Sequence, residues 1–511
     1  MTAVRKAPVW LLAAGLALLY YVCDPRTADL AAQVYRTELF QREGFALWDT
    51  GWYAGHALPG YSTLFPPAAA LLGPRVAAAI AMVIATALFE RLTEHRLATA
   101  LFATGMTSML FSGRLTFVLG AAIGVGALLA LRHDRRTVAI ALAVATSLGS
   151  PVAGLFLALC GAAYAIDRRR PLGAAIAAAA IAPVLILGLV FEGGGTFPFE
   201  FDAFIPGFLA TVLLFALIPR SHCLLRIGVA LNALLLLCAF TFDTQVGGNA
   251  MRLGSLAAAS IAAIALLDKR RLAFALILPA LLFWQWSSAI DDWVRASGDD
   301  SVHAAYYAPL LGFLDRQDTP LRIEIPFTDN HWDATHVGLR YPLARGWERQ
   351  ADRKLNPMFY GSKDFDSAEY ARWLRDNAVS FVALPDAPLD YSAAHEARLI
   401  RAGQPYLKPV FRSAHWRVFA VRDPAPLLTG GKLLSVTTDT ITLRSDGAGT
   451  ARLRFRWTPY WRISEGTGCV ERDGDWTKLA LRGAGRVELT TTFTPGRIGA
   501  SGAACSGVSG D

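Results

Sequence analysis

The residues best suited to chemistry lie in one polar stretch, residues 23–67, which separates the first two hydrophobic segments. Within it, Asp29, Gln33 and Arg36 follow the spacing i, i+4 and i+7, so a helix would place all three on one face. Such a face combines a carboxylate that can accept a hydroxyl proton with a guanidinium that can hold a phosphate. The spacing predicts Asp29 as a general base. Asp49 is the second candidate, although its segment is equally typical of a turn or a helix N-cap.

The other predicted external loops contribute polar residues that a compact helical bundle would bring together at the membrane surface. A transferase with a lipid-phosphate sugar donor needs cationic or amide groups that hold the departing phosphate. The candidate substrate-binding residues are Gln33, Arg36, Trp52, His56, Arg114, Asn249 and Arg252. Simpler interpretations stay open: Asp29 can be solvated, Arg252 can contact lipid headgroups, and His56 can occupy a surface turn. Trp52 can belong to an aromatic belt at the membrane interface.

The composition is that of a membrane protein. Hydrophobic residues make up 54% of the 511 residues, and they gather in long segments, which excludes an ordinary soluble enzyme. The net charge of +8 does not indicate nucleic-acid binding, because Arg and Lys occur in short clusters between the hydrophobic segments. By the positive-inside rule, such clusters mark cytoplasmic loops.

These segments predict a polytopic α-helical membrane domain, residues 1–293, with about eleven spans, several of them shorter than the roughly 20 residues that a bilayer requires. The basic N-terminus and the basic loops then all fall in the cytoplasm. The loop 23–67 and everything after Trp293 fall outside the plasma membrane. The predicted spans lie near 8–22, 74–91, 97–111, 115–131, 138–148, 152–166, 172–191, 205–219, 226–241, 254–267 and 272–289.

The C-terminal part has the composition of a soluble region. Residues 299–425 alternate strand and helix patterns, which predicts an α/β module. Residues 432–511 contain only short alternating strands, which predicts a β-sandwich. Cys469 and Cys505 share this extracytoplasmic region, where a disulfide between them is chemically allowed.

A metal site is not indicated by ligand spacing. His331 and His336 lie near Asp329 and Asp333, but their spacing matches no tight ligand motif. The need for a cofactor, including a divalent cation, is left open.

Several segments resemble the GT-C superfamily of membrane glycosyltransferases. The likeness is to the group labelled "6-pyruvoyl-tetrahydropterin synthase-related" membrane proteins, many of them from actinobacteria. Ala28, Gln33 and Leu47 stand where that group has glycine, histidine and arginine, so Asp29, Arg36 and Asp49 are the matched positions. The segments are D-L-A-A-Q-V-Y-R-T (29–37), G-F-A-L-W-D-T-G-W-Y-A-G (44–55), G-Y-S-T-L-F-P-P (60–67), S-G-R-L-T-F (112–117) and N-A-M-R-L (249–253).

The resemblance implies a base aspartate in the first external loop and a polyprenyl-phosphate sugar donor. It also implies transfer of arabinofuranose or of a hexose such as mannose to a cell-envelope glycan or glycolipid. Two other hypotheses remain. A transporter or lipid-carrier flippase is disfavoured because ionisable residues are nearly absent from the predicted spans and no inverted repeat is evident. In a non-catalytic glycan-binding scaffold, the loop carboxylates would be incidental.

Overall fold

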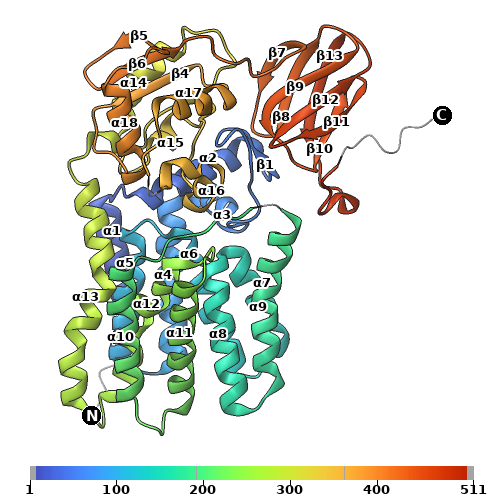
Figure 1. Cartoon of the computed structure of the whole chain (residues 1–511). Helices are drawn as coiled ribbons and strands as arrows, with labels where there is room; N and C mark the ends of the chain where they lie inside the picture. The colour runs from blue at the N-terminus through green and yellow to red at the C-terminus, as the bar shows by residue number, and fades with distance from the viewer. Residues whose placement is uncertain (1–6, 192, 362, 503–511) are drawn as a thin grey trace. The chain divides into compact units, whose positions relative to one another are not determined.

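The computed structural model describes residues 7–191, 193–361 and 363–502. The chain forms two compact units (Figure 1). The first contains the N-terminal segment up to Thr37, then Gly60–Gly188 and Gly195–Ser297. The second contains Glu38–Pro59, Leu189–Gly194 and the chain from Gly298 onward. A division was expected near residues 293–299; the structure divides after Ser297 and also assigns part of the first loop to the second unit.

The first unit is a bundle whose long helices run side by side (Figure 1). Alanine, the strongest helix former, also lets neighbouring helices approach closely. The pair α5 and α12 illustrates this, because Ala98 of one and Ala259 of the other are buried in the same core. The helices are α1 (Trp10–Cys23), α2 (Ala28–Glu43, which continues into the second unit), α3 (Phe65–Leu72), α4 (Pro74–Thr93), α5 (Arg96–Phe111), α6 (Leu115–Arg132), α7 (Arg136–Gly149), α8 (Pro151–Arg168), α9 (Pro171–Val190), α10 (Phe201–Leu217), α11 (Cys223–Thr241), η1 (Gly247–Ala250), α12 (Met251–Leu266) and α13 (Arg271–Ala296).

Each of the predicted hydrophobic segments is a helix. Seven helices of the described chain are long and apolar enough to cross a membrane: α4, α6, α8, α9, α11, α12 together with η1, and α13. Large apolar side chains such as Leu71, Leu189 and Phe283 are exposed on the surface of the protein, as expected for lipid contact. The helices α1, α7 and α10 are apolar but shorter, so the total of about eleven spans stays a prediction.

The second unit contains the α/β module that the sequence predicts after residue 299. Its sheet has the order β3-β4-β6-β5, with β3 and β4 parallel and the other neighbours antiparallel. Helix α17 begins with a capping box formed by Asp366 and Glu369. The elements are η2 (Asp300–Val302), α14 (Ala304–Leu314), β3 (Ile323–Glu324), α15 (Asp333–His336), α16 (Arg349–Leu355), η3 (Pro357–Tyr360), α17 (Ser367–Asp376), β4 (Phe381–Pro385), η4 (Tyr391–Ala393), α18 (Ala394–Arg401), β5 (Leu407–Arg412) and β6 (Trp416–Val421).

The strand-rich end of the second unit consists of two antiparallel sheets with the orders β10-β13-β8-β7 and β11-β12-β9. Ile441 and Leu489 of one sheet share a buried core with Leu453 and Leu479 of the other, which makes this part a sandwich. Cys469 lies on β11, whereas Cys505 lies outside the described residues. The elements are β7 (Gly431–Val436), β8 (Thr440–Ser445), β9 (Gly449–Arg456), β10 (Trp461–Glu465), β11 (Gly468–Asp473), β12 (Trp476–Leu481), β13 (Gly485–Thr491) and η5 (Pro495–Arg497).

A short hairpin of the first loop, β1 (Trp48–Asp49) and β2 (His56–Ala57), joins the α/β module to the sandwich. On one side, the amide of Leu343 donates to the carbonyl of Gly51 at 2.8 Å. On the other, the amide of Thr50 donates to the carbonyl of Thr438 at 2.9 Å, and Trp48 enters the sandwich core. This hairpin is therefore part of the architecture of the second unit.

Candidate functional site

The first turn of α2 is fixed against the turn between α5 and α6. The hydroxyl group of Thr27 donates to the carbonyl of Phe111 at 3.3 Å. Gly113 has φ +74°, and a Cβ at this position would overlap the backbone nitrogen of Leu30. Only glycine combines this left-handed conformation with so close an approach. The segment S-G-R-L-T-F therefore places its arginine beside the start of α2.

Asp29 lies between two guanidinium groups that come from distant parts of the chain. Its Oδ2 atom is 3.7 Å from Nε of Arg114 and 3.8 Å from Nη2 of Arg252. The Asp29 side chain is 37% exposed, whereas those of Arg114 and Arg252 are 20% and 16% exposed. Cζ of Arg252 also lies 5.9 Å from the ring centroid of Phe117. The carboxylate thus faces solvent from a cationic, partly buried setting.

Asp29, Gln33 and Arg36 lie on one helical segment, α2, as the spacing predicts. Gln33 and Arg36 both contact Tyr61. Nε2 of Gln33 donates to the Tyr61 hydroxyl oxygen at 3.2 Å. Cζ of Arg36 lies 4.0 Å from the centroid of the Tyr61 ring. Of the predicted residues, Asp29, Arg114 and Arg252 are therefore brought together, and Gln33 and Arg36 follow Asp29 on the same helix.

The position of Arg252 depends on the turn that precedes α12. Gly247 has φ +42°, and a Cβ there would overlap the carbonyl oxygen of Phe197, so a side chain would separate these two segments. Asn249, in η1, is buried, and its backbone N–H donates to the carbonyl of Val246 at 2.9 Å. Asn249 thus belongs to the turn from which Arg252 extends.

Asp292, near the end of α13, is a member of the cluster that the sequence reasoning missed. It interacts electrostatically with Arg114, Arg252 and Asp29, and its Oδ1 atom forms an ion pair with Nη2 of Arg295 at 2.7 Å. The signal was present in the sequence, because two adjacent aspartates at the end of the last hydrophobic segment are unusual beside a membrane.

Asp24, the other carboxylate at the end of α1, has partners of its own. It forms an ion pair with Arg26 at 3.1 Å and a second one with Arg75. It therefore resembles Asp29 in being paired with two guanidiniums, but its partners are different residues.

Asp49, Trp52 and His56 belong to the second unit and have structural contacts there. Oδ1 of Asp49 accepts a hydrogen bond from the amide of Gly51 at 2.8 Å, which is the geometry of a turn. His56 stacks on Trp52 with ring centroids 5.7 Å apart, and its Nδ1 lies 3.8 Å from Oδ2 of Asp49. The indole of Trp52 is completely buried and donates to the carbonyl of Ala334 at 3.0 Å. Trp52 has no exposed face for a substrate.

An apolar groove of about 670 Å³ runs along α3, α4, α6 and α7 in the first unit. Phe65 and Leu119 line it, and Leu119 follows Arg114 by five residues, or about 7.5 Å along the helix. Arg91 and Arg135 also line the groove. Its apolar wall therefore begins close to the cluster around Asp29.

A second charge cluster is buried in the α/β module around Arg345. Nη2 of Arg345 is 2.6 Å from Asp352 Oδ2, and Nη1 is 3.6 Å from Glu396 Oε2. Glu396 also accepts a hydrogen bond from the Tyr370 hydroxyl group at 2.6 Å, and Glu324 is completely buried beside it. Burial raises the pKa of Glu396 to about 7, and burial together with the charge of Glu396 raises the pKa of Glu324 well above its usual value. Because a raised pKa means that Glu396 binds its proton more tightly in the folded module, the free energy of unfolding should fall as the pH rises through 7.

His331 and Asp333 have contacts of other kinds. His331 stacks on Trp347 with ring centroids 3.5 Å apart, and its Nε2 is 3.3 Å from Oδ2 of Asp390. Asp333 accepts a hydrogen bond from the Thr328 hydroxyl group at 2.6 Å. Within the described ranges, no group of three or more His, Cys, Asp or Glu residues is arranged to hold a metal ion.

Comparison with protein-family models and with curated proteins finds no match to this chain.

Proposed function

We propose that the chain is a membrane glycosyltransferase of the GT-C type. It transfers arabinofuranose or a hexose such as mannose from a polyprenyl-phosphate donor to a cell-envelope glycan or glycolipid. The observation that carries the proposal is the carboxylate of Asp29 between the guanidiniums of Arg114 and Arg252. This arrangement puts a base and two phosphate ligands at one place, as the reaction requires.

In the proposed reaction, Asp29 accepts the proton of an acceptor hydroxyl group. The hydroxyl oxygen forms a bond to the anomeric carbon while the bond from that carbon to the donor phosphate oxygen breaks. The bonding electron pair leaves with the phosphate, so the configuration at the anomeric carbon inverts. Arg114 and Arg252 stabilise the charge that develops on the phosphate, because guanidiniums form strong charge-assisted hydrogen bonds to phosphate oxygens. Arg36 supplies further positive charge at the other end of the cluster.

The apolar groove supports a lipid donor over a water-soluble one. A polyprenyl chain is apolar, and its burial against residues such as Phe65 and Leu119 would be favourable. A donor with its phosphate at Arg114 would have its lipid chain next to the beginning of this groove. A nucleotide sugar would gain nothing from such a surface.

In the proposed orientation, the N-terminus is cytoplasmic, and both the Asp29 cluster and the second unit are extracytoplasmic. The basic residues of the loops at Arg132 to Arg136 and at Lys269 to Arg271 support it, because cytoplasmic loops carry an excess of positive charge. Labelling of a C-terminal tag in intact cells with an impermeant reagent tests the orientation. A tag that reacts only after cell lysis contradicts it.

A turnover assay tests the function. Purified full-length protein in nanodiscs receives radiolabelled polyprenyl-phospho-arabinofuranose or polyprenyl-phospho-mannose together with envelope acceptors. We expect product with wild type, and a loss of about 100- to 10,000-fold with Asp29→Asn, because general-base catalysis contributes that much.

The matched control is Asp24→Asn, which removes a carboxylate that also pairs with two guanidiniums. It should retain most of the activity. Equal activity of Asp29→Asn and wild type would remove Asp29 as base. No turnover with any donor would favour the transporter or scaffold hypothesis.

A further inference from the structure

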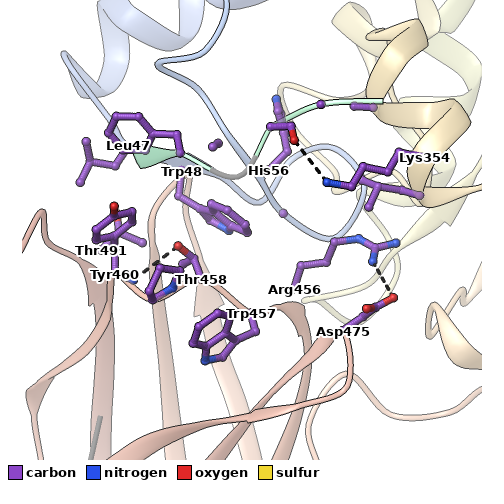
Figure 2. Close-up of a pocket in the computed structure, with 18 of the residues that line it drawn as sticks. Leu47, Trp48, His56, Lys354, Arg456, Trp457, Thr458, Tyr460, Asp475 and Thr491 are labelled. Atoms are coloured by element: carbon purple, nitrogen blue, oxygen red, sulfur yellow. Dashed lines mark hydrogen bonds and ion pairs between the residues drawn. The ribbon is translucent and has the colours of Figure 1, made fainter. Parts of the chain in front are cut away.

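A small cleft lies in the second unit where the hairpin β1-β2, helix α16 and the sandwich meet (Figure 2). Its volume is about 210 Å³, which is below the roughly 300–1,000 Å³ of pockets for drug-sized ligands. The cleft therefore has room for a ligand of about one ring. None of its lining residues belongs to the Asp29 cluster.

Aromatic side chains form much of the wall of this cleft. Trp48 packs edge-to-face on Trp461, with ring centroids 6.4 Å apart, and Trp457 and Tyr460 line the cleft beside it. The Tyr460 hydroxyl group donates to the carbonyl of Val190 at 2.7 Å, which fixes this ring. These rings are held in place before any ligand binds.

Polar atoms accompany the rings. Nε1 of Trp48 and Oγ1 of Thr491 are buried and have no hydrogen-bond partner among the described residues.

Charged side chains complete the cleft, and cations outnumber anions. Nη1 of Arg456 is 3.3 Å from Oδ2 of Asp475, and both side chains are drawn in Figure 2. Nζ of Lys354 donates to the carbonyl of Gly193 at 3.2 Å. Cζ of Arg472 lies 5.1 Å from the ring centroid of Trp457. Neither Lys354 nor Arg472 has an ion pair with a carboxylate in the part of the chain that the structure describes.

We propose that this cleft binds a sugar ring of the acceptor glycan. A sugar presents apolar C–H groups that pack on aromatic faces and hydroxyl groups that bind charged donors and acceptors. The small exposed parts of Trp48 and Trp457, whose side chains are 7% and 8% exposed, provide the first kind of surface. Arg456, Arg472, Asp475 and Lys354 provide the second. The inference rests on the proposed transferase function, because it assigns the cleft to that reaction's acceptor.

Binding measured without turnover tests the inference. The full-length protein in nanodiscs is titrated with fluorescent oligo-arabinofuranosides and oligo-mannosides, and anisotropy gives Kd. Trp457→Ala removes an aromatic contact and Arg472→Gln removes a charged hydrogen-bond donor, and each should weaken binding about two- to tenfold, or about 0.4–1.4 kcal/mol. Trp457→Phe keeps an aromatic face and should restore most of the affinity. Arg417→Gln, on β6 outside the cleft lining, is the control and should bind as wild type does.

Asp29→Asn separates this inference from the proposed function, because it should bind the oligosaccharide normally while it loses turnover. The glycan-binding inference fails if wild type binds neither probe, or if both cleft variants bind as wild type does. Because Arg472 is exposed, Arg472→Gln should keep the fold. Its Kd for the oligosaccharide therefore tests the inference even if Trp457→Ala does not fold.

Discussion

Replacement of Asp29 by asparagine should affect turnover and phosphate binding in opposite directions. The substitution keeps the shape of the side chain and removes its charge. Turnover should fall, because the amide cannot accept the proton. The affinity for polyprenyl phosphate, the product that remains of the donor, should rise. In the wild type, the Asp29 carboxylate competes with this phosphate for the guanidiniums of Arg114 and Arg252, and the substitution removes that competition.

The size of the gain follows from the geometry. Oδ2 of Asp29 lies 3.7 and 3.8 Å from the guanidinium nitrogens, so a phosphate oxygen on the same groups would be near the carboxylate. Two like charges about 5 Å apart repel by about 1 kcal/mol in a water-like dielectric, which suits a side chain that is 37% exposed. Asp29→Asn should therefore bind polyprenyl phosphate about fivefold more tightly.

The assay is a titration of the full-length protein in nanodiscs with polyprenyl phosphate at two salt concentrations. The gain should shrink at high salt, because exposed charges are screened. Arg252→Gln should instead weaken binding about tenfold or more, since a charge-assisted hydrogen bond contributes about 1.5–3 kcal/mol. Weaker binding by Asp29→Asn would refute the reasoning, because it would mean that the carboxylate only arranges the arginines. Asp24→Asn should leave the Kd unchanged.

Three further predictions concern stability and covalent structure. Gly113→Ala should lower the melting temperature more than Gly73→Ala; both positions have positive φ, which costs about 1–2 kcal/mol for alanine, but only the Gly113 position also meets the backbone of α2. Equal shifts would contradict the close approach. Glu396 has a pKa of about 7 in the folded protein against an ordinary 4.5, so the stability it contributes is full below pH 4.5 and is lost as the pH rises through 7. Thermal unfolding at several pH values should show this slope in wild type and a flatter one in Glu396→Gln; an unchanged slope would exclude Glu396 as its source. Peptide mapping by mass spectrometry without reduction should recover Cys469 joined to Cys505, whereas alkylation of both thiols would contradict the bridge.

The sequence predicts the helical face of α2 well, because periodicity is a local property. Asp29, Gln33 and Arg36 needed only the 3.6-residue repeat. Periodicity does not predict the approach of Arg114 and Arg252 to Asp29. That approach depends on the order in which the helices cross the bundle, which places the three loops at the same end. The glycines that permit these approaches, such as Gly113, look in the sequence like ordinary turn residues.

Other features could not be predicted because they depend on distant parts of the chain. Trp48 and Trp52 have the composition of a membrane-interface belt, yet both are buried in the second unit. Their partners follow hundreds of residues later, and no local pattern reveals them. Strands β10 and β11 are hard to place from the sequence for another reason: their exposed, charged residues break the alternation of apolar and polar residues that is typical of a strand.

The hairpin of the first loop also constrains when the second unit can fold. The carbonyl of Tyr53 accepts a hydrogen bond from Nε of Arg456 across 403 residues. The hairpin is therefore synthesised long before the β-strands that contact it. Until those strands are made, Trp48 lacks the core residues against which it packs. Contacts of such long range form slowly, and an uncovered apolar segment invites aggregation or chaperone capture. Completion of the second unit thus depends on strands that are synthesised about 400 residues after the hairpin that they hold.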